Sequence, residues 1–113
     1  VMHDCIANDH SWDLCKSFAG ASPVGLLHPA AEIGHPDAGD IVLEVNGETR
    51  QHGDINQLIW KTADIVSRLS GYAPLRAGDI IFTGTPKGPK AVVPGDNLAG
   101  RISGVGTLDI SIK

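Results

Sequence analysis

One stretch of this chain, residues 78–86, reads Gly78-Asp79-Ile80-Ile81-Phe82-Thr83-Gly84-Thr85-Pro86. A Gly-Asp turn precedes three β-branched or aromatic residues, a pattern that predicts a buried strand over residues 80–82. Thr83, Gly84 and Thr85 follow, and their hydroxyls and backbone N–H groups suit a carboxylate or a carbonyl oxygen. An ordinary loop after a strand has the same composition, so the stretch alone leaves both interpretations open.

The composition is that of a folded chain of one domain's length. Of its 113 residues, 42% are hydrophobic and 19% are charged, which argues against disorder. The net charge of −4 argues against nucleic acid as a partner. No apolar run approaches the roughly 20 residues of a membrane span. Cys5 and Cys15 lack zinc-site spacing, and in an acidic chain they predict reduced thiols and a cytoplasmic protein.

Hydrophobic periodicity predicts a mostly β chain with one main helix. Strands are expected over residues 1–7, 41–45, 49–51, 80–82, 97–102 and 107–112. Asn46-Gly47 is a strong hairpin signal. Asp54 is a suitable N-cap with Gln57 three residues later, which predicts a helix over about residues 54–70. The fold class is therefore α+β, with the helix packed on a sheet.

One turn chemistry is used three times. A Gly-Asp pair precedes three of the predicted strands, at Gly39-Asp40, Gly78-Asp79 and Gly95-Asp96. Glycine supplies a left-handed backbone position, and aspartate can accept hydrogen bonds from neighbouring backbone N–H groups. We therefore expect the same local turn at all three places.

Two charged residues near the start could carry chemistry. Asp9 lies beside Asn8 and His10, and its oxygens suit Mg²⁺, Mn²⁺ or Ca²⁺, although a turn-capping aspartate would look the same. Lys16 lies among small and apolar residues. It could hold a substrate carboxylate or enolate, or it could be an ordinary surface lysine.

Several short motifs follow one another along almost the whole chain. In order they are Asn8-Asp9-His10-Ser11, Lys16-Ser17-Phe18, Val45-Asn46-Gly47-Glu48, Arg50-Gln51, residues 78–86, Pro94-Gly95-Asp96 and residues 102–108. In this order they resemble the fumarylacetoacetate hydrolase family. Further short motifs, including Gly34-His35-Pro36 and Ile59-Trp60, are most similar to those of the bacterial fumarylpyruvate and acylpyruvate hydrolases.

The resemblance implies a fold, a site and partners. It implies one catalytic domain over residues 1–113, built as a mixed β-sheet roll or sandwich and usually found as a homodimer. It also implies a divalent metal, Mg²⁺ or else Mn²⁺ or Ca²⁺, with Asp9 as one ligand. Lys16 matches the catalytic lysine that contacts substrate near the metal. Gly84 and Thr85 match the loop that receives the substrate carboxylate, and Gln51 is assigned to substrate binding.

The implied activity is hydrolysis of a C–C bond in a 1,3-diketo acid, as in the breakdown of aromatic compounds. The metal would polarise a carbonyl and activate water, and Lys16 would stabilise the departing enolate. Oxaloacetate decarboxylation and isomerisation or hydration of a dienoate are alternatives on the same scaffold. A small β-rich binding module without catalysis is the alternative of a different class.

The chain departs from the family pattern in two places. A Glu-x-Glu metal pair expected before the first strand is absent, and so is an Arg-Asp pair expected between Ser11 and Trp12. We therefore expect an incomplete domain that lacks an N-terminal part and a loop at that junction, where a true deletion would look the same. The 113 residues alone would lack most of the metal carboxylates, and we expect no hydrolase activity from them alone.

Overall fold

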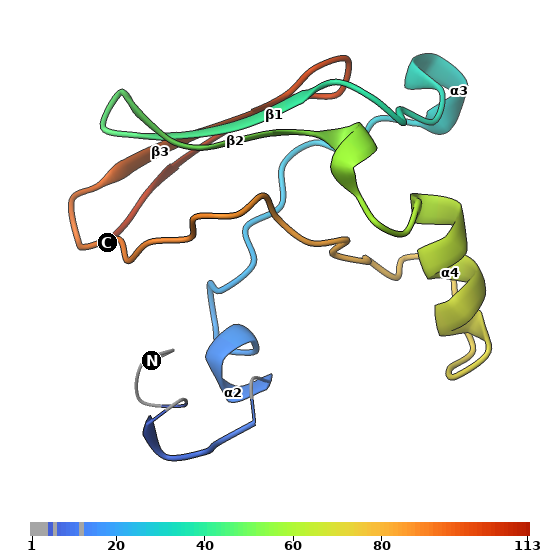
Figure 1. The fold of residues 1–113 in the computed structure, drawn as a ribbon, viewed down its shortest axis with the longest axis horizontal. Helices are drawn as coiled ribbons and strands as arrows, with labels where there is room; N and C mark the ends of the chain where they lie inside the picture. The colour runs from blue at the N-terminus through green and yellow to red at the C-terminus, as the bar shows by residue number, and fades with distance from the viewer. Residues whose placement is uncertain (1–4, 6, 12) are drawn as a thin grey trace.

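The computed structural model describes residues 5, 7–11 and 13–113. The elements whose bounds are described begin with α2 (Asp13–Lys16), α3 (Ala30–Ile33), β1 (Asp40–Val45) and β2 (Glu48–Asp54). The later elements are the 3-10 turn η1 (Ile55–Gln57), α4 (Thr62–Ser70), β3 (Asn97–Ile102) and β4 (Gly106–Ser111). Figure 1 shows the sheet on one side and α2 on the other. The expected α+β class is confirmed.

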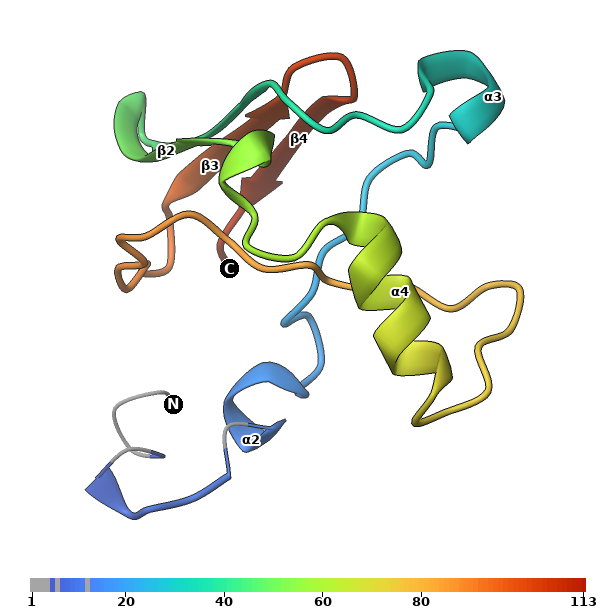
Figure 2. The same ribbon diagram turned by 45° about the vertical axis from the view of Figure 1, so that its right-hand side comes forward.

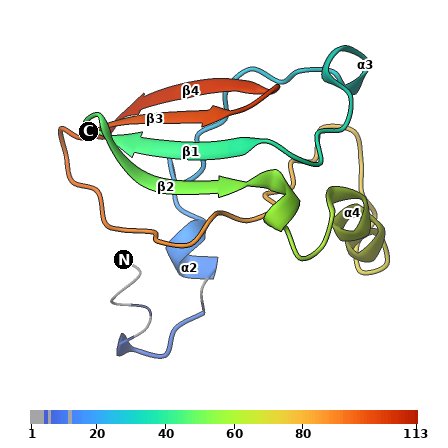
Figure 3. The ribbon, with the colours of Figure 1, turned by 45° about the horizontal axis from the view of Figure 1, so that its top comes forward.

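The four strands form one antiparallel sheet in the order β2-β1-β3-β4 (Figure 3). The β1–β2 hairpin turns at Asn46 and Gly47, whose φ angles of 53° and 80° are those of the predicted tight turn. The Asn46 side chain also ties this hairpin to β3: Nδ2 donates to Asp96 Oδ1 at 2.8 Å, and Oδ1 accepts from the Asn97 backbone N–H at 2.9 Å.

The sheet has one apolar and one polar face. Residues paired across strands share a face, and the register aligns Leu43 with Gly100 and Gly100 with Leu108. The apolar face therefore carries Ile41, Leu43, Val45, Leu98, Ile102, Leu108 and Ile110. On the opposite face Arg101 pairs with Glu44 at 2.8 Å. Two valines of β1 are buried, Val45 on the apolar face and Val42 on the opposite face, where it pairs with Arg101.

The predicted helix over residues 54–70 is divided in two. Asp54 and Gln57 do form the expected capping box, but it begins only the short turn η1. The carbonyl of Asn56 would accept from residue 60 in a continuous helix, and instead accepts from Lys61 Nζ at 2.9 Å. A second start follows, where the Lys61 backbone N–H donates to Asp64 Oδ2 at 3.3 Å. Helix α4 begins there and lies beyond the end of the sheet, not across its face (Figure 2).

The predicted strand over residues 80–82 is wrong. The segment belongs to no strand of the sheet, and Ile80 and Phe82 are 54% and 66% exposed. A strand forms only where a neighbour takes its backbone hydrogen bonds, and the described part of the chain offers this segment no strand partner. Of the strand predicted over residues 1–7, only residues 5 and 7 are described, and both are helical. The rest of it lies outside the described residues, as does Trp12 of the suspected junction.

The repeated Gly-Asp turn is confirmed in its backbone and, at two places, in its side chains. Gly39, Gly78 and Gly95 have φ angles of 134°, 99° and 96°. Asp79 Oδ2 accepts from the Arg76 backbone N–H at 2.7 Å, and Asp96 Oδ2 accepts from Val93 at 2.9 Å. At the first turn Asp40 instead contacts His52 Nε2 at 2.9 Å. None of the described helices is long and apolar enough to cross a membrane.

Candidate functional site

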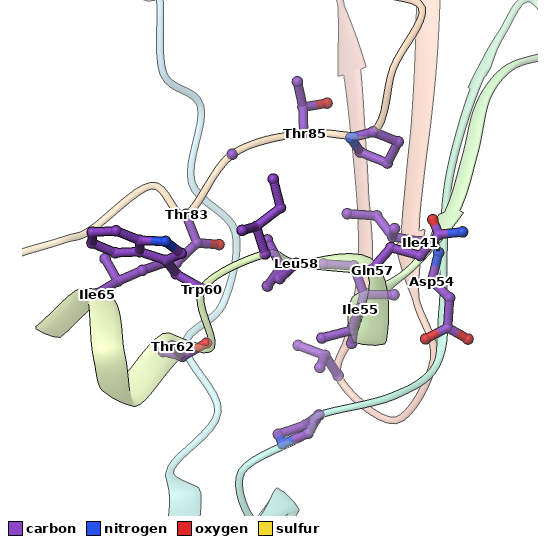
Figure 4. A pocket seen from close by; sticks show the side chains of 16 residues that line it. Ile41, Asp54, Ile55, Gln57, Leu58, Trp60, Thr62, Ile65, Thr83 and Thr85 are labelled. Carbon is purple, nitrogen blue, oxygen red and sulfur yellow. Dashed lines mark hydrogen bonds between the residues drawn. The ribbon is translucent and has the colours of Figure 1, made fainter.

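The candidate site is a loop over the apolar face of the sheet, residues 83–86. Gly84 has a φ angle of 115°, in the left-handed region that suits glycine, and a Cβ there would meet nothing within 4 Å. Figure 4 shows the Thr83 side chain beside Trp60, whereas Thr85 points away from Leu58. The two hydroxyls of the loop therefore face different surroundings.

Strand β2 holds this loop through a buried amide. Gln51 is 9% exposed, and its Nε2 donates to the Pro86 carbonyl at 2.6 Å and to Thr85 Oγ1 at 3.2 Å. Two residues along the same strand, Gly53 leaves room for the Pro86 ring, because a Cβ there would lie 3.1 Å from Pro86 Cγ. The loop is thus fixed to β2 by a polar contact and by a close steric fit.

The loop borders two cavities of similar size, about 680 and 660 Å³. Thr85 and Pro86 line both. The first cavity has a mainly apolar wall from β1, η1, α4 and the segment that joins η1 to α4, including Ile41, Ile55, Leu58, Trp60 and Ile65. The second lies between the loop and the segment before α3, and its wall includes Gly25, His28, Gln51, Thr107 and Leu108. A ligand oxygen can therefore approach the loop from either side.

Asp54 at the first cavity is ionised at neutral pH. Its pKa is lowered chiefly by a hydrogen bond from the Asn56 backbone N–H, at 2.8 Å, and also by one from Gly39, at 3.1 Å. A carboxylate that is held by backbone donors in this way is a poor proton acceptor. Asp54 therefore caps a turn and is not a candidate general base.

The structure brings together only some of the predicted site residues. Gln51, Gly84 and Thr85 meet at the loop. Asp9 is exposed with a φ angle of 53°, Lys16 is the exposed last residue of α2, and neither lines either cavity. The described residues contain no group of three His, Cys, Asp or Glu side chains that could hold a metal ion. One exposed carboxylate does not fit a divalent cation, which takes several oxygen ligands.

Sequence reasoning assigned Gln51 to substrate binding and missed its contact with Thr85. A signal was present, because Gln51 pairs with Leu43 and so falls on the apolar face of β2. A polar side chain at such a position needs a hydrogen-bond partner. Gly53 beside Pro86 was missed as well, since a close approach between distant segments leaves no local pattern.

Comparison with known proteins now gives the family. The family model described as "Fumarylacetoacetate (FAA) hydrolase C-terminal" matches residues 1–113. The chain belongs to the fumarylacetoacetate hydrolase family. Among solved structures of this fold, the fumarylpyruvate hydrolase from Pseudomonas aeruginosa in complex with Mn²⁺ and pyruvate is 43% identical, with a TM-score of 0.90. The likeness covers 97% of this chain and 47% of that one.

Curated members of the fumarylacetoacetate hydrolase family differ in their activities. The fumarylpyruvate hydrolase of Ralstonia sp is 38% identical over 101 residues, which are 89% of this chain and 52% of the relative. The mitochondrial oxaloacetate tautomerase FAHD1 of Rattus norvegicus is 36% identical over 113 residues, which are 100% of this chain and 51% of the relative. The chain thus spans about half the length of the curated relatives it matches.

Proposed function

We propose that the complete protein carrying this chain hydrolyses a C–C bond in a 1,3-diketo acid of the fumarylpyruvate or acylpyruvate type. The observation that carries the proposal is the 43% identity, over 97% of the chain, to a fumarylpyruvate hydrolase in complex with Mn²⁺ and pyruvate. Such a diketo acid ends in a pyruvyl unit, which has a carboxylate next to a keto group. The small, hydroxyl-bearing loop at residues 83–85 suits that unit.

The loop is assigned the role of orienting the substrate. The Thr85 hydroxyl and the backbone N–H groups at Gly84 and Thr85 would hold the terminal carboxylate and fix the distance of the scissile bond from the reacting groups. Lys16 would place a positive charge near the enolate that leaves when water adds to the distal carbonyl and the C–C bond breaks. The enolate then takes a proton, which completes a pyruvate product beside the acid.

A divalent cation is part of this proposal because two family members are known with Mn²⁺ and pyruvate. Asp9 is the one ligand proposed from this chain. The described residues do not make a metal centre by themselves, so the proposal requires ligands beyond them.

Oxaloacetate tautomerisation is the second candidate. It is favoured by the mammalian FAHD1 relatives, which match all 113 residues at 34 to 36% identity. Oxaloacetate also presents a carboxylate next to a keto group, so the same loop could receive it. The two activities differ in whether a C–C bond breaks, and this difference can be measured.

The test is an ultraviolet assay of the complete protein with Mg²⁺ or Mn²⁺, in which fumarylpyruvate, acetylpyruvate and oxaloacetate are compared. We expect the diketo-enol absorbance of the first two to fall while pyruvate forms in equal amount. Interconversion of oxaloacetate enol and keto forms, with neither diketo acid cleaved, would support the second candidate. An unchanged absorbance for both diketo acids would refute hydrolysis.

A further inference from the structure

We propose that Gln51 is a positioning residue that fixes the Thr85 hydroxyl as a hydrogen-bond donor toward the substrate. The inference rests on the proposed function, in which Thr85 contacts a substrate oxygen. It differs from the sequence-based assignment of Gln51 to substrate binding, because here Gln51 acts through Thr85.

The orientation of the Gln51 amide follows from its partners. The Pro86 carbonyl, 2.6 Å from the amide nitrogen, can only accept a hydrogen bond. The group facing it must therefore be the NH₂ end of the side chain, which assigns the two ends of the amide unambiguously. The second proton of that NH₂ group is directed to Thr85 Oγ1 at 3.2 Å. Both donors of the amide are then in use.

The direction of the second bond sets the polarity of Thr85. Because Oγ1 accepts from Gln51, the single hydroxyl proton of Thr85 must point elsewhere. Thr85 borders both cavities, so its O–H can donate into either of them. This proton attracts an anionic oxygen of a ligand. If the Thr85 hydroxyl instead donated its proton to Gln51, its oxygen lone pairs would face the anionic ligand and repel it.

The amide is held so that it cannot easily reverse this arrangement. Gln51 is 9% exposed, and the Gln51 side chain shares the apolar face with Leu43. Turning the amide over would place its oxygen against the Pro86 carbonyl and leave two acceptors in contact. A buried polar group without its partner is costly, so the donor orientation is strongly preferred.

The test uses two substitutions at Gln51 in the complete protein, with pyruvate affinity by calorimetry and KM and kcat as readouts. In Q51E the introduced carboxylate has no proton, so it accepts the Thr85 hydroxyl and reverses its polarity. We expect pyruvate affinity to fall and KM to rise about tenfold at pH 8, with kcat within about twofold.

Q51M provides the neutral comparison. Methionine is close in size and neither donates nor accepts strongly, so it should also lower pyruvate affinity and raise KM while kcat stays within about twofold. His52 lies next to Gln51 on the opposite face of β2 and contacts Asp40. The control H52Q should leave affinity and KM unchanged. If Q51E does not fold, Q51M together with the substitution T85V still tests whether Gln51 acts through Thr85.

A double-mutant cycle with T85V separates the outcomes. If Gln51 acts through Thr85, adding Q51M to T85V should change pyruvate affinity by less than about twofold. A further tenfold loss on the T85V background would overturn the role of Gln51. If T85V alone leaves affinity unchanged, Thr85 does not contact the substrate and the positioning role fails with it. If the protein proves not to be a hydrolase, the double-mutant cycle on pyruvate affinity can still be measured. A failure of the proposed function is therefore distinguishable from a failure of the Gln51 proposal.

Discussion

Replacing Gly53 with alanine should destabilise the protein, because this strand glycine leaves the space that the Pro86 ring occupies. An added Cβ would lie 3.0 Å from Gln57 Oε1 and 3.1 and 3.2 Å from two carbons of Pro86. Pro86 cannot easily retreat, since its carbonyl is bound by Gln51, and Gln57 accepts from the Asp54 backbone N–H at 3.1 Å. Overpacking of this kind costs about 1–3 kcal/mol. The lower entropy of the unfolded alanine chain returns about 0.4–1 kcal/mol.

The expected net loss for G53A is therefore about 1–2 kcal/mol, or a fall of about 0.5–1 M in the urea midpoint of unfolding. Gly100 is the matched control, because it lies on the same face and its Cβ would meet only the Leu108 carbonyl, at 3.6 Å. G100A should keep or slightly raise the midpoint. If G53A and G100A have equal midpoints at or above that of the wild type, the close fit between β2 and Pro86 is refuted.

Three further predictions concern stability and metal binding. N46A removes two side-chain hydrogen bonds and leaves alanine at a φ of 53°, so it should cost about 2–3 kcal/mol in urea unfolding. N46G, which tolerates that angle, should cost less, and equal losses would contradict this account. The pKa of Asp54 is lowered mainly by the Asn56 N–H and that of Asp96 by the Val93 N–H, so the native state binds fewer protons than the unfolded state. The contribution of these two carboxylates to stability should therefore be full above about pH 5 and be lost as the pH drops through about 4 and below. The fall in stability should be smaller in D96N. An identical fall in D96N and in the wild type would count against this prediction. Calorimetric titration of the 113-residue chain alone with Mn²⁺ should show no binding tighter than about millimolar, and tight binding would show that its own residues suffice.

The parts of the fold that were predictable are those set by neighbouring residues. Asn46 and Gly47 specify their turn by themselves, and the alternation of β4 is visible over a few positions. The capping box of Asp54 and Gln57 was also predictable, but the break after it was not. That break depends on Lys61 reaching back to the Asn56 carbonyl, a contact that does not affect hydrophobic periodicity.

The parts that were not predictable depend on partners far away in the sequence. Residues 80–82 have the composition of a strand, yet a strand also requires a neighbour to pair with, and local composition cannot supply one. Gln51 and Thr85 are 34 positions apart, so no motif links them. The family resemblance indicated both residues as parts of one site, whereas only the structure showed the hydrogen bond between them.

The most direct measurement is a crystal structure of the complete protein with Mn²⁺ and pyruvate. We expect the pyruvate carboxylate within hydrogen-bond distance of Thr85 Oγ1, with Gln51 Nε2 bonded to the same oxygen from the other side. A carboxylate bound away from residues 83–85, or a Gln51 amide that contacts pyruvate directly and not Thr85, would contradict it.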